Sequence, residues 1–462
     1  MQTNGGKNMR TFTTEEIAAF TGGQASGHAD ISSVVIDNRE VTPGALFIGI
    51  VGERLDGHQF IPAAVDAGAA AVMAHKDVDC AVPVIRVADT TQGFLDLAGA
   101  YRNEFDIPVV GLTGSVGKTT TKEMIWCVLG ARYCAHKTYL NWNNEIGLPK
   151  VLLGLSPDHT AAVIEMGMNH KGEIARLTKI ARPTVGVITN VGVSHIENLG
   201  SREGILAAKL ELLEGMAPGT PLILNKDNDM LATVTCADHP IIWFGLHADG
   251  LDVSAEDITY PETGTRFTAV AGTERCTVEL PTTGEHNVYD ALAALAAGLQ
   301  TGIPLAEGAR ALANYRPAGM RGNVVEAGGV TVIEDCYNAS PDSMKALADT
   351  LMLKGTPGRR KIAVIGDMLE LGDYTEEAHR LAGTYMAEAG VDMLLTYGPE
   401  SRLAAEAARN GGLMRVFDFT DKDDLAEKLI SMLKPGDVVA FKASHGMHLE
   451  EVIERVYKAL EK

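Results

Sequence analysis

Residues 109–121, VVGLTGSVGKTTT, have the composition and spacing of a phosphate-binding loop. An apolar stretch leads into a glycine-containing turn, and Lys118 and Thr119 follow at the start of a predicted helix. In such a loop the backbone N–H groups converge on an anion, the lysine adds a positive charge, and the hydroxyl can bind Mg²⁺. The usual motif would have a glycine at the position of Leu112, so this loop has a shorter spacing. We predict a nucleotide site; the alternative is an ordinary glycine turn before a helix.

A carboxylate, an imidazole and a second lysine lie further along the chain. Glu165 ends the apolar stretch 161–164, His195 follows the stretch 185–189, and Lys209 lies on a predicted helix. In an open parallel sheet, ligands bind beyond the carboxyl ends of the strands, which places Glu165 beside the loop as a ligand for Mg²⁺. Taken singly, a surface glutamate, a capping or core histidine and a solvated lysine are the alternative interpretations.

Three more polar segments occupy positions where a ligand is expected. Residues 284–292 open an alanine-rich helix whose first turn could contact a base. Residues 333–344 and 366–372 each follow a predicted strand and lie at the ligand-binding edge of its sheet. Ordinary turns rich in Asn, Asp and Gly are the alternative for both loops.

The elements that would position these groups alternate between short apolar strands and helices, which is typical of parallel sheets covered on both faces. Alternating β-branched residues between 253 and 280 predict antiparallel hairpins. The chain is therefore predicted to be an α/β protein of three domains. They are a small mixed α/β domain (1–106), a central P-loop parallel-sheet ATPase domain with a β-hairpin insertion (107–314) and a C-terminal Rossmann-like α/β domain (315–462). The third domain lacks a GxGxxG segment, so NAD is not expected there. The strands predicted for the second and third domains are 109–112, 161–165, 185–189, 221–225, 241–244, 330–333, 361–365, 393–396 and 438–441.

Composition narrows the class of protein. The 462 residues include 60 acidic and 40 basic side chains, a formal net charge of −20 without any cluster of Lys and Arg, which argues against a nucleic-acid partner. The six cysteines form no CxxC pair and indicate free thiols in a reducing compartment. Neither a signal peptide nor an apolar run long enough for membrane insertion is recognisable. We expect a cytoplasmic monomer.

Taken in order, these segments resemble the ATP-dependent Mur ligases of peptidoglycan synthesis over essentially the whole chain. The loop TGSVGKTT at 113–120 has the short spacing of that family. The stretches NWNNEIG at 141–147, DCYNASPDSM at 335–344 and GDMLELG at 366–372 are similar to the branch that adds D-alanyl-D-alanine. Together these motifs are specific, whereas each alone is weak.

The resemblance implies the cofactors ATP and Mg²⁺, with UDP-N-acetylmuramoyl-tripeptide and D-alanyl-D-alanine as the substrates that are joined. ATP would phosphorylate a carboxylate to an acyl phosphate, the dipeptide amine would attack it, and the tetrahedral intermediate would expel phosphate. It also implies that Lys118, Glu165, His195 and Lys209 are catalytic. Thr119 and Glu165 would bind one Mg²⁺ and His195 a second, while Lys209, carbamylated by CO₂, would support the second ion.

Further residues take their roles only from the resemblance. The predicted ATP-binding residues are Thr113, Gly114, Ser115, Gly117, Lys118, Thr119, Thr120, Asn225, Asn287, Arg321 and Asp335. The predicted residues for the sugar nucleotide, the muramoyl peptide and the dipeptide are Asp37, Arg39, Asn141, Asn143, Asn144, Asn338, Asp367 and Glu370. Because Arg321 and Asp335 belong to the third domain, closure of the domains would complete the site.

The chain departs from the family pattern at three places. Asp290 stands where the helix usually has a second asparagine, which puts that adenine contact in question. Asn38 replaces a common serine. His445 replaces an arginine and would be a weaker, pH-dependent contact for an anion. The sequence does not indicate whether the third peptide residue is lysine or diaminopimelate.

Three other classes of protein are alternatives, and each would differ from this sequence in one feature. A folylpolyglutamate synthase would be similar only over the central and C-terminal parts. A Mur ligase that adds the third residue typically carries a histidine at the position of Asn338. A nucleotide-binding switch protein would have no use for Glu165, His195 and Lys209 together.

Overall fold

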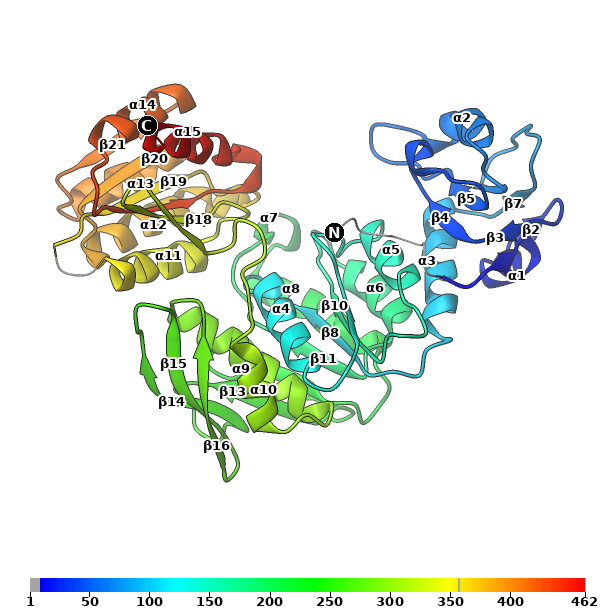
Figure 1. Cartoon of the computed structure of the whole chain (residues 1–462), viewed down its shortest axis with the longest axis horizontal. Coiled ribbons are helices and arrows are strands. Elements are labelled where there is room, and N and C mark those ends of the chain that lie inside the picture. The colour runs from blue at the N-terminus through cyan, green and yellow to red at the C-terminus, as the bar shows by residue number, and fades with distance from the viewer. Residues whose placement is uncertain (1–8, 356–357, 462) are drawn as a thin grey trace.

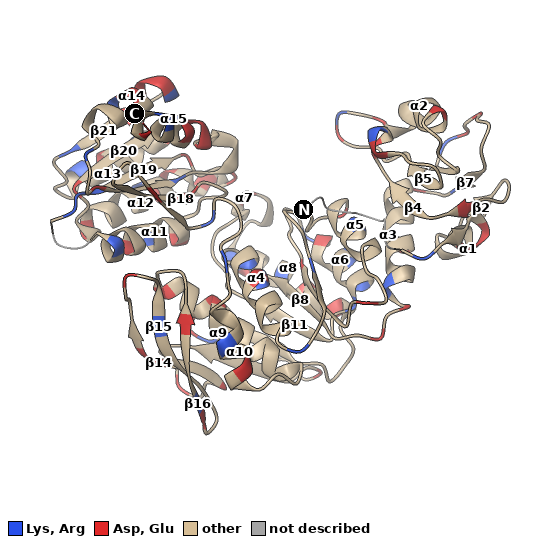
Figure 2. Ribbon diagram, viewed as in Figure 1, with Lys and Arg blue, Asp and Glu red and all other residues tan. Residues whose placement is uncertain are grey.

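The computed structural model describes residues 9–355 and 358–461. It contains three α/β units, each with its own sheet, and the central unit lies between the other two (Figure 1). Most neighbouring strands are parallel, which confirms the predicted α/β class. Figure 2 shows acidic residues along the ribbon of all three units, including a group on the last two helices, α14 (Lys422–Met432) and α15 (Glu450–Leu460). Among the described residues, no helix combines the length and apolar character needed to cross a bilayer.

The N-terminal unit is a five-stranded sheet that a long helix attaches to the central unit. From α3 (Thr90–Arg102), the Tyr101 hydroxyl donates to the carbonyl of Leu155 at 2.8 Å, and the Arg102 guanidinium donates to the carbonyl of Ala181 at 3.0 Å. The strands, in spatial order, are β2 (Gln24–Ala25), β7 (Val84–Arg86), β6 (Ala71–Ala74), β5 (Ala45–Ile48) and β4 (Ser33–Val35), and α2 (Ile61–Asp66) covers them.

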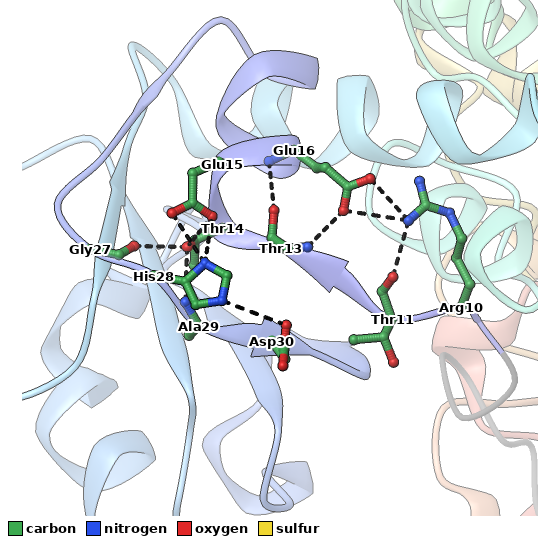
Figure 3. A network of polar contacts seen from close by, with 10 residues as sticks. All are labelled: Arg10, Thr11, Thr13, Thr14, Glu15, Glu16, Gly27, His28, Ala29 and Asp30. Atoms are coloured by element: carbon green, nitrogen blue, oxygen red, sulfur yellow. Dashed lines mark hydrogen bonds and ion pairs between the residues drawn. The ribbon is translucent and has the colours of Figure 1, made fainter.

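A polar network fixes the first helix of this unit (Figure 3). Helix α1 (Thr14–Phe20) begins with a capping box, in which the Thr13 hydroxyl accepts the Glu16 N–H at 3.2 Å and the Glu16 carboxylate accepts the Thr13 N–H at 2.8 Å. Arg10 joins Glu16 to Glu104, just beyond α3. The short pair β1 (Phe12–Thr13) and β3 (Asp30–Ile31) runs beside the helix.

The central unit is a nine-stranded sheet, and the segment 253–280, predicted to form antiparallel hairpins, contributes three of its strands. Strand β14 pairs in parallel with β13, and β15 and β16 then extend the sheet in antiparallel fashion. The order is β16 (Glu274–Leu280), β15 (Thr265–Ala271), β14 (Val253–Thr259), β13 (Ile241–Gly245), β12 (Leu222–Asn225), β11 (Val185–Ile188), β8 (Val109–Thr113), β10 (Ala161–Glu165) and β9 (Ala135–Lys137).

Two apolar layers bury both faces of this sheet, which is why its parallel strands are continuous apolar runs. Alternate residues of β8 show the division: Val110 packs in one layer and Val109 in the other. The first layer is formed by α4 (Lys118–Leu129), α9 (Glu285–Gln300) and α10 (Leu305–Leu312), and the second by α3, α5 (Gly147–Leu153), α6 (Glu173–Ala181) and α8 (Arg202–Leu210).

The C-terminal unit is a six-stranded sheet with helices on both faces, as expected for a Rossmann-like fold. The order is β17 (Asn323–Ala327), β18 (Val330–Asp335), β22 (Val438–Lys442), β19 (Lys361–Gly366), β20 (Met393–Tyr397) and β21 (Val416–Phe419), and only β17 is antiparallel to its neighbour. One face packs on α11 (Pro341–Lys354), α12 (Thr375–Ala389) and α13 (Ser401–Asn410), and the other on α14 and α15.

We expect Thr13→Ala to loosen α1, because it removes the cap on one N–H of the first turn. Loss of a cap costs about 1 kcal/mol, so hydrogen exchange of the segment 12–20, measured by mass spectrometry, should accelerate about fivefold. Thr11→Ala is the matched control, since the Thr11 hydroxyl bonds to no described residue and only its carbonyl accepts from Arg10. Equal exchange in the two variants would contradict the capping role.

Candidate functional site

The phosphate loop joins β8 to α4 in a backbone conformation that requires glycine at two positions. Gly117 has φ +79°, in the left-handed region, and precedes the first residue of α4. Gly114 lies against Thr189, where a Cβ would come within 1.8 Å of the threonine hydroxyl. Any other residue at Gly114 would push the loop away from the neighbouring strand β11.

Four consecutive N–H groups at the start of α4 have no acceptor among the described residues. They belong to Gly117, Lys118, Thr119 and Thr120, and the first three N–H groups of a helix have no partner within it. The Lys118 ammonium folds back onto the carbonyl of Gly114 at 2.8 Å, and burial lowers its pKa. This arrangement can bind an anion through backbone dipoles and one cation.

Asn190 holds the rest of the loop, and sequence reasoning missed it. Its side-chain oxygen accepts the N–H groups of Ser115 at 3.1 Å and Val116 at 2.9 Å, and its amide donates to the carbonyl of Val116 at 3.1 Å. Two loop amides are therefore committed to a protein acceptor, while the next four stay free. The only signal in the sequence was a polar residue directly after the strand 185–189.

Glu165 lies beside the loop, as the sequence predicted, because β10 pairs with β8. Its buried carboxylate accepts from the Thr119 hydroxyl at 3.0 Å and from the Asn143 amide at 2.8 Å. The Lys122 ammonium, fully buried on α4, lies 3.7 Å away. Carboxylate and hydroxyl oxygens are the ligands that Mg²⁺ prefers, so Thr119 and Glu165 fit this ion.

His195 and Lys209 are two further predicted groups close to Lys118. His195 adopts φ +64° before the short helix α7 (Ile196–Leu199), and its Nδ1 lies 2.7 Å from a Glu370 oxygen, an ion-pair distance without hydrogen-bond geometry. Burial is the main cause that lowers the pKa of His195, and Lys118 lowers it further. Lys209 is buried without an ion-pair or hydrogen-bond partner among the described residues. Burial and then Lys118 hold its pKa well below the usual lysine value.

The described side chains alone do not make a complete metal site. No group of three or more His, Cys, Asp and Glu residues gathers within the ranges 9–355 and 358–461. Mg²⁺ is usually held by one or two carboxylates together with substrate phosphates and water. The single carboxylate of Glu165 beside the phosphate loop is consistent with this mode of binding.

A cavity of about 460 Å³ joins the loop to the C-terminal unit. Asp335, at the end of β18, is ion-paired with the buried Lys442 at the end of β22. The Arg321 guanidinium lies 3.6 Å from the centre of the Tyr337 ring, and the ring of His445 stacks on the same tyrosine at 5.7 Å. The residues predicted from the sequence that line this cavity are Ser115, Gly117, Lys118, Thr120, Asn143, Asn144, Glu165, His195, Asn225, Asn287, Arg321, Asp335 and Asn338.

Other predicted residues lie outside the cavity. Asp37 and Arg39 pair with each other at 2.6 Å on the N-terminal unit, and the arginine lowers the pKa of Asp37 to about 2. Asn141 is exposed on the loop before α5. The residues that line the cavity do not include Thr113, Gly114, Thr119 or Lys209.

Hydrogen bonds to three other segments hold the loop 366–371 in place. The buried Asp367 carboxylate accepts the Ser401 N–H at 2.7 Å and so caps α13 instead of facing the cavity. The Met368 N–H donates to His379 at 3.0 Å, and the Leu369 N–H donates to the Ser444 hydroxyl at 2.9 Å. Glu370 follows with φ +63° and projects toward His195.

Comparison with known proteins covers all three units. Three family models match: "Mur ligase family, catalytic domain" at residues 30–109, "Mur ligase middle domain" at 112–298 and "Mur ligase, glutamate ligase domain" at 320–445. The UDP-N-acetylmuramoyl-tripeptide–D-alanyl-D-alanine ligase of Bacillus subtilis is 41% identical, over 92% of this chain and 93% of that protein.

Solved structures agree with this assignment. MurF from Acinetobacter baumannii is 30% identical with a TM-score of 0.92, covering 98% of this chain and 100% of the other. MurF ligase from Thermotoga maritima, solved in complex with ADP, is 31% identical with a TM-score of 0.84, covering 93% and 97%. On these matches along nearly its whole length, the chain belongs to the Mur ligase family.

Proposed function

We propose that this chain is an ATP-dependent ligase that joins D-alanyl-D-alanine to the carboxylate of UDP-N-acetylmuramoyl-tripeptide, releasing ADP and phosphate. The observation that carries the proposal is the cavity in which the phosphate loop, Glu165 and His195 of the central unit meet Arg321 and Asp335 of the C-terminal unit. The similarity to ligases of that name along the whole chain supports the choice of substrates. We further propose that the enzyme acts as a monomer in cytoplasmic peptidoglycan precursor synthesis.

Phosphoryl transfer from ATP to a carboxylate depends on charge neutralisation and positioning of the reactants more than on covalent catalysis by the enzyme. The γ-phosphoryl group of ATP passes to the tripeptide carboxylate, the dipeptide amine attacks the resulting acyl phosphate, and the tetrahedral intermediate expels phosphate. The free N–H groups of residues 117–120 and the Lys118 ammonium hold the phosphates of ATP. Thr119 and Glu165 would hold Mg²⁺, which neutralises phosphate charge when bound.

Lys209 is proposed to carry a carbamate formed with CO₂. Burial and the neighbouring Lys118 lower the pKa of this lysine, which favours the neutral amine that adds to CO₂. The addition releases a proton and leaves a carbamate, which carries a negative charge beside Lys118. Together with His195, the carbamate would support a second Mg²⁺.

The substrate sites extend to the outer units. On the N-terminal unit, Asp37 and Arg39 are proposed to receive the sugar nucleotide. On the C-terminal unit, Asn338 and Glu370 are proposed to contact the dipeptide, and Asp367 acts by capping α13 and fixing the loop that presents Glu370. Asn141, Asn143 and Asn144 would border the muramoyl peptide, and Asn225 and Asn287, with Thr113 to Ser115 behind them, the nucleotide.

Phosphate release should require every substrate at once, because the acyl phosphate needs both ATP and the tripeptide and its breakdown needs the dipeptide amine. The measurement is phosphate release with ATP, Mg²⁺, tripeptide or dipeptide omitted in turn, using lysine- and diaminopimelate-containing tripeptides. Turnover with folate and glutamate, or equal rates without the dipeptide, would contradict the assignment.

Lys209→Ala should lower the rate of phosphate release by about a hundredfold or more, since it removes the group that would support a metal ion. Short-chain carboxylates such as acetate should restore part of the activity by replacing the carbamate. Lys179→Ala, which removes an exposed lysine paired with Glu214, is the matched control and should retain activity. Full activity of Lys209→Ala would refute the carbamate.

Asn190→Ala should raise the KM for ATP by about tenfold, because three side-chain hydrogen bonds that hold the loop are lost while its free amides remain. Asn228→Ala is the matched control: its amide donates to Val191 near the same loop but contacts no phosphate-loop residue. Steady-state kinetics with varied ATP compares the two. If both variants bind ATP alike, Asn190 does not hold the loop in its binding conformation.

A further inference from the structure

Asp290 lies directly against the phosphate loop. It occupies the second turn of α9, its side chain is 8% exposed, and it lines the cavity. Its Oδ1 accepts the Thr121 hydroxyl at 2.7 Å. A Cβ on Gly117 would come within 2.6 Å of the same oxygen, so the carboxyl group contacts the loop where its N–H groups are free.

This carboxyl group has no positive partner. Within the described part of the chain, no Lys, Arg or His nitrogen forms an ion pair with it, and burial raises its pKa to about 7, opposed only by the bond from Thr121. The elements packed around α9 carry further ionisable groups. Those that are not exposed are Lys118, Lys122, Glu123 and Cys127 on α4, Glu307 on α10, Tyr315 after α10, Asp227 after β12, and Tyr289 on α9 itself; those that are exposed are Glu256 and Asp257 on β14, Arg310 on α10, and Glu285 and His286 on α9.

The two lysines in that set interact with groups other than Asp290. Lys118 turns to the carbonyl of Gly114, and Lys122 lies 3.1 Å from Glu123. The His286 ring is exposed, and its Nε2 lies 2.9 Å from the Asn287 amide. An ionised Asp290 would therefore lie beside the phosphates of a nucleotide without an ion-pair partner of its own among the described residues.

A nucleotide at the loop adds negative charge beside this carboxyl group. Like charges that share a buried site favour the protonated acid, so a bound nucleotide shifts the carboxyl further toward its neutral form. We propose that Asp290 is a proton-bearing residue of the nucleotide site, and that binding of ADP or ATP takes up a proton there. This inference rests on the nucleotide site proposed above.

The sign of the pH dependence follows from linkage. The nucleotide-bound protein holds a proton that the free protein loses as the pH rises through the pKa of free Asp290, so affinity is highest at low pH and falls above it. The fall is at most about tenfold for each pH unit. An asparagine at this position has the same shape without a charge, and the affinity of that variant should not change with pH through this group.

The test is calorimetric titration of the full chain with Mg²⁺-ADP from about pH 6.5 to about pH 8.5, in two buffers of different ionisation enthalpy. The native chain should take up a fraction of a proton on binding, and its Kd should rise with pH. Asp290→Asn should lose that uptake and bind more tightly than the native chain at the high-pH end. Its titration also provides the baseline for protons exchanged by the ligand itself.

Two further variants serve as controls. Asp342→Asn, on α11, removes another carboxyl group that lines the same cavity and whose pKa is raised by desolvation, and it should keep the native proton uptake. Thr121→Val removes the bond that favours the ionised acid while leaving Asp290 in place, so the Kd curve should move to higher pH.

The outcomes separate this proposal from the proposed function. Loss of uptake in Asp290→Asn together with the shift in Thr121→Val supports it. Equal uptake by Asp290→Asn and the native chain, or loss of uptake only in Asp342→Asn, overturns it while leaving the nucleotide site intact. If the native chain binds no nucleotide at any pH, the proposed function fails as well.

Discussion

The site depends on four backbone N–H groups at the start of α4 that no described protein group accepts. They stay available because the neighbouring amides of Ser115 and Val116 are bonded to Asn190, and because Gly117 adopts a left-handed conformation that turns the chain into the helix. The apolar side of α4 is buried against α9 and the sheet, which fixes the direction in which these groups point. The other polar groups of the cavity, such as Glu165 and His195, surround this anion site.

The cavity contains basic side chains although the chain as a whole is acidic. The chain has a formal charge of −20, yet Lys118, Lys209 and Arg321 meet at the cavity or just behind it. Burial lowers the pKa of both lysines, since charged amines lose hydration there. Anionic substrates would supply the missing negative charge, whereas an ionised carboxyl group of Asp290, which lies on α9 against the phosphate loop, would act against them.

Much of the fold was predictable because both the burial of the parallel strands and the periodicity of the helices are local patterns. The nine strands predicted in the central and C-terminal units are all present, with bounds that differ by a residue or two. The short strands β9, β17 and β21 were missed. They lie at or next to sheet edges, where few residues are buried and the apolar signal is weak.

The sequence by itself determined the phosphate loop, the neighbourhood of Glu165 and the resemblance to Mur ligases, since these depend on short segments and on the order of parallel strands. Only the tertiary structure decided which polar side chains serve the site and which serve the scaffold. Asp367 caps a helix and Asn190 holds the loop, although both are polar residues just after a strand. The physical reason is that a polar group after a strand can bond to any partner within reach, and partners far apart in sequence are brought within reach only by packing.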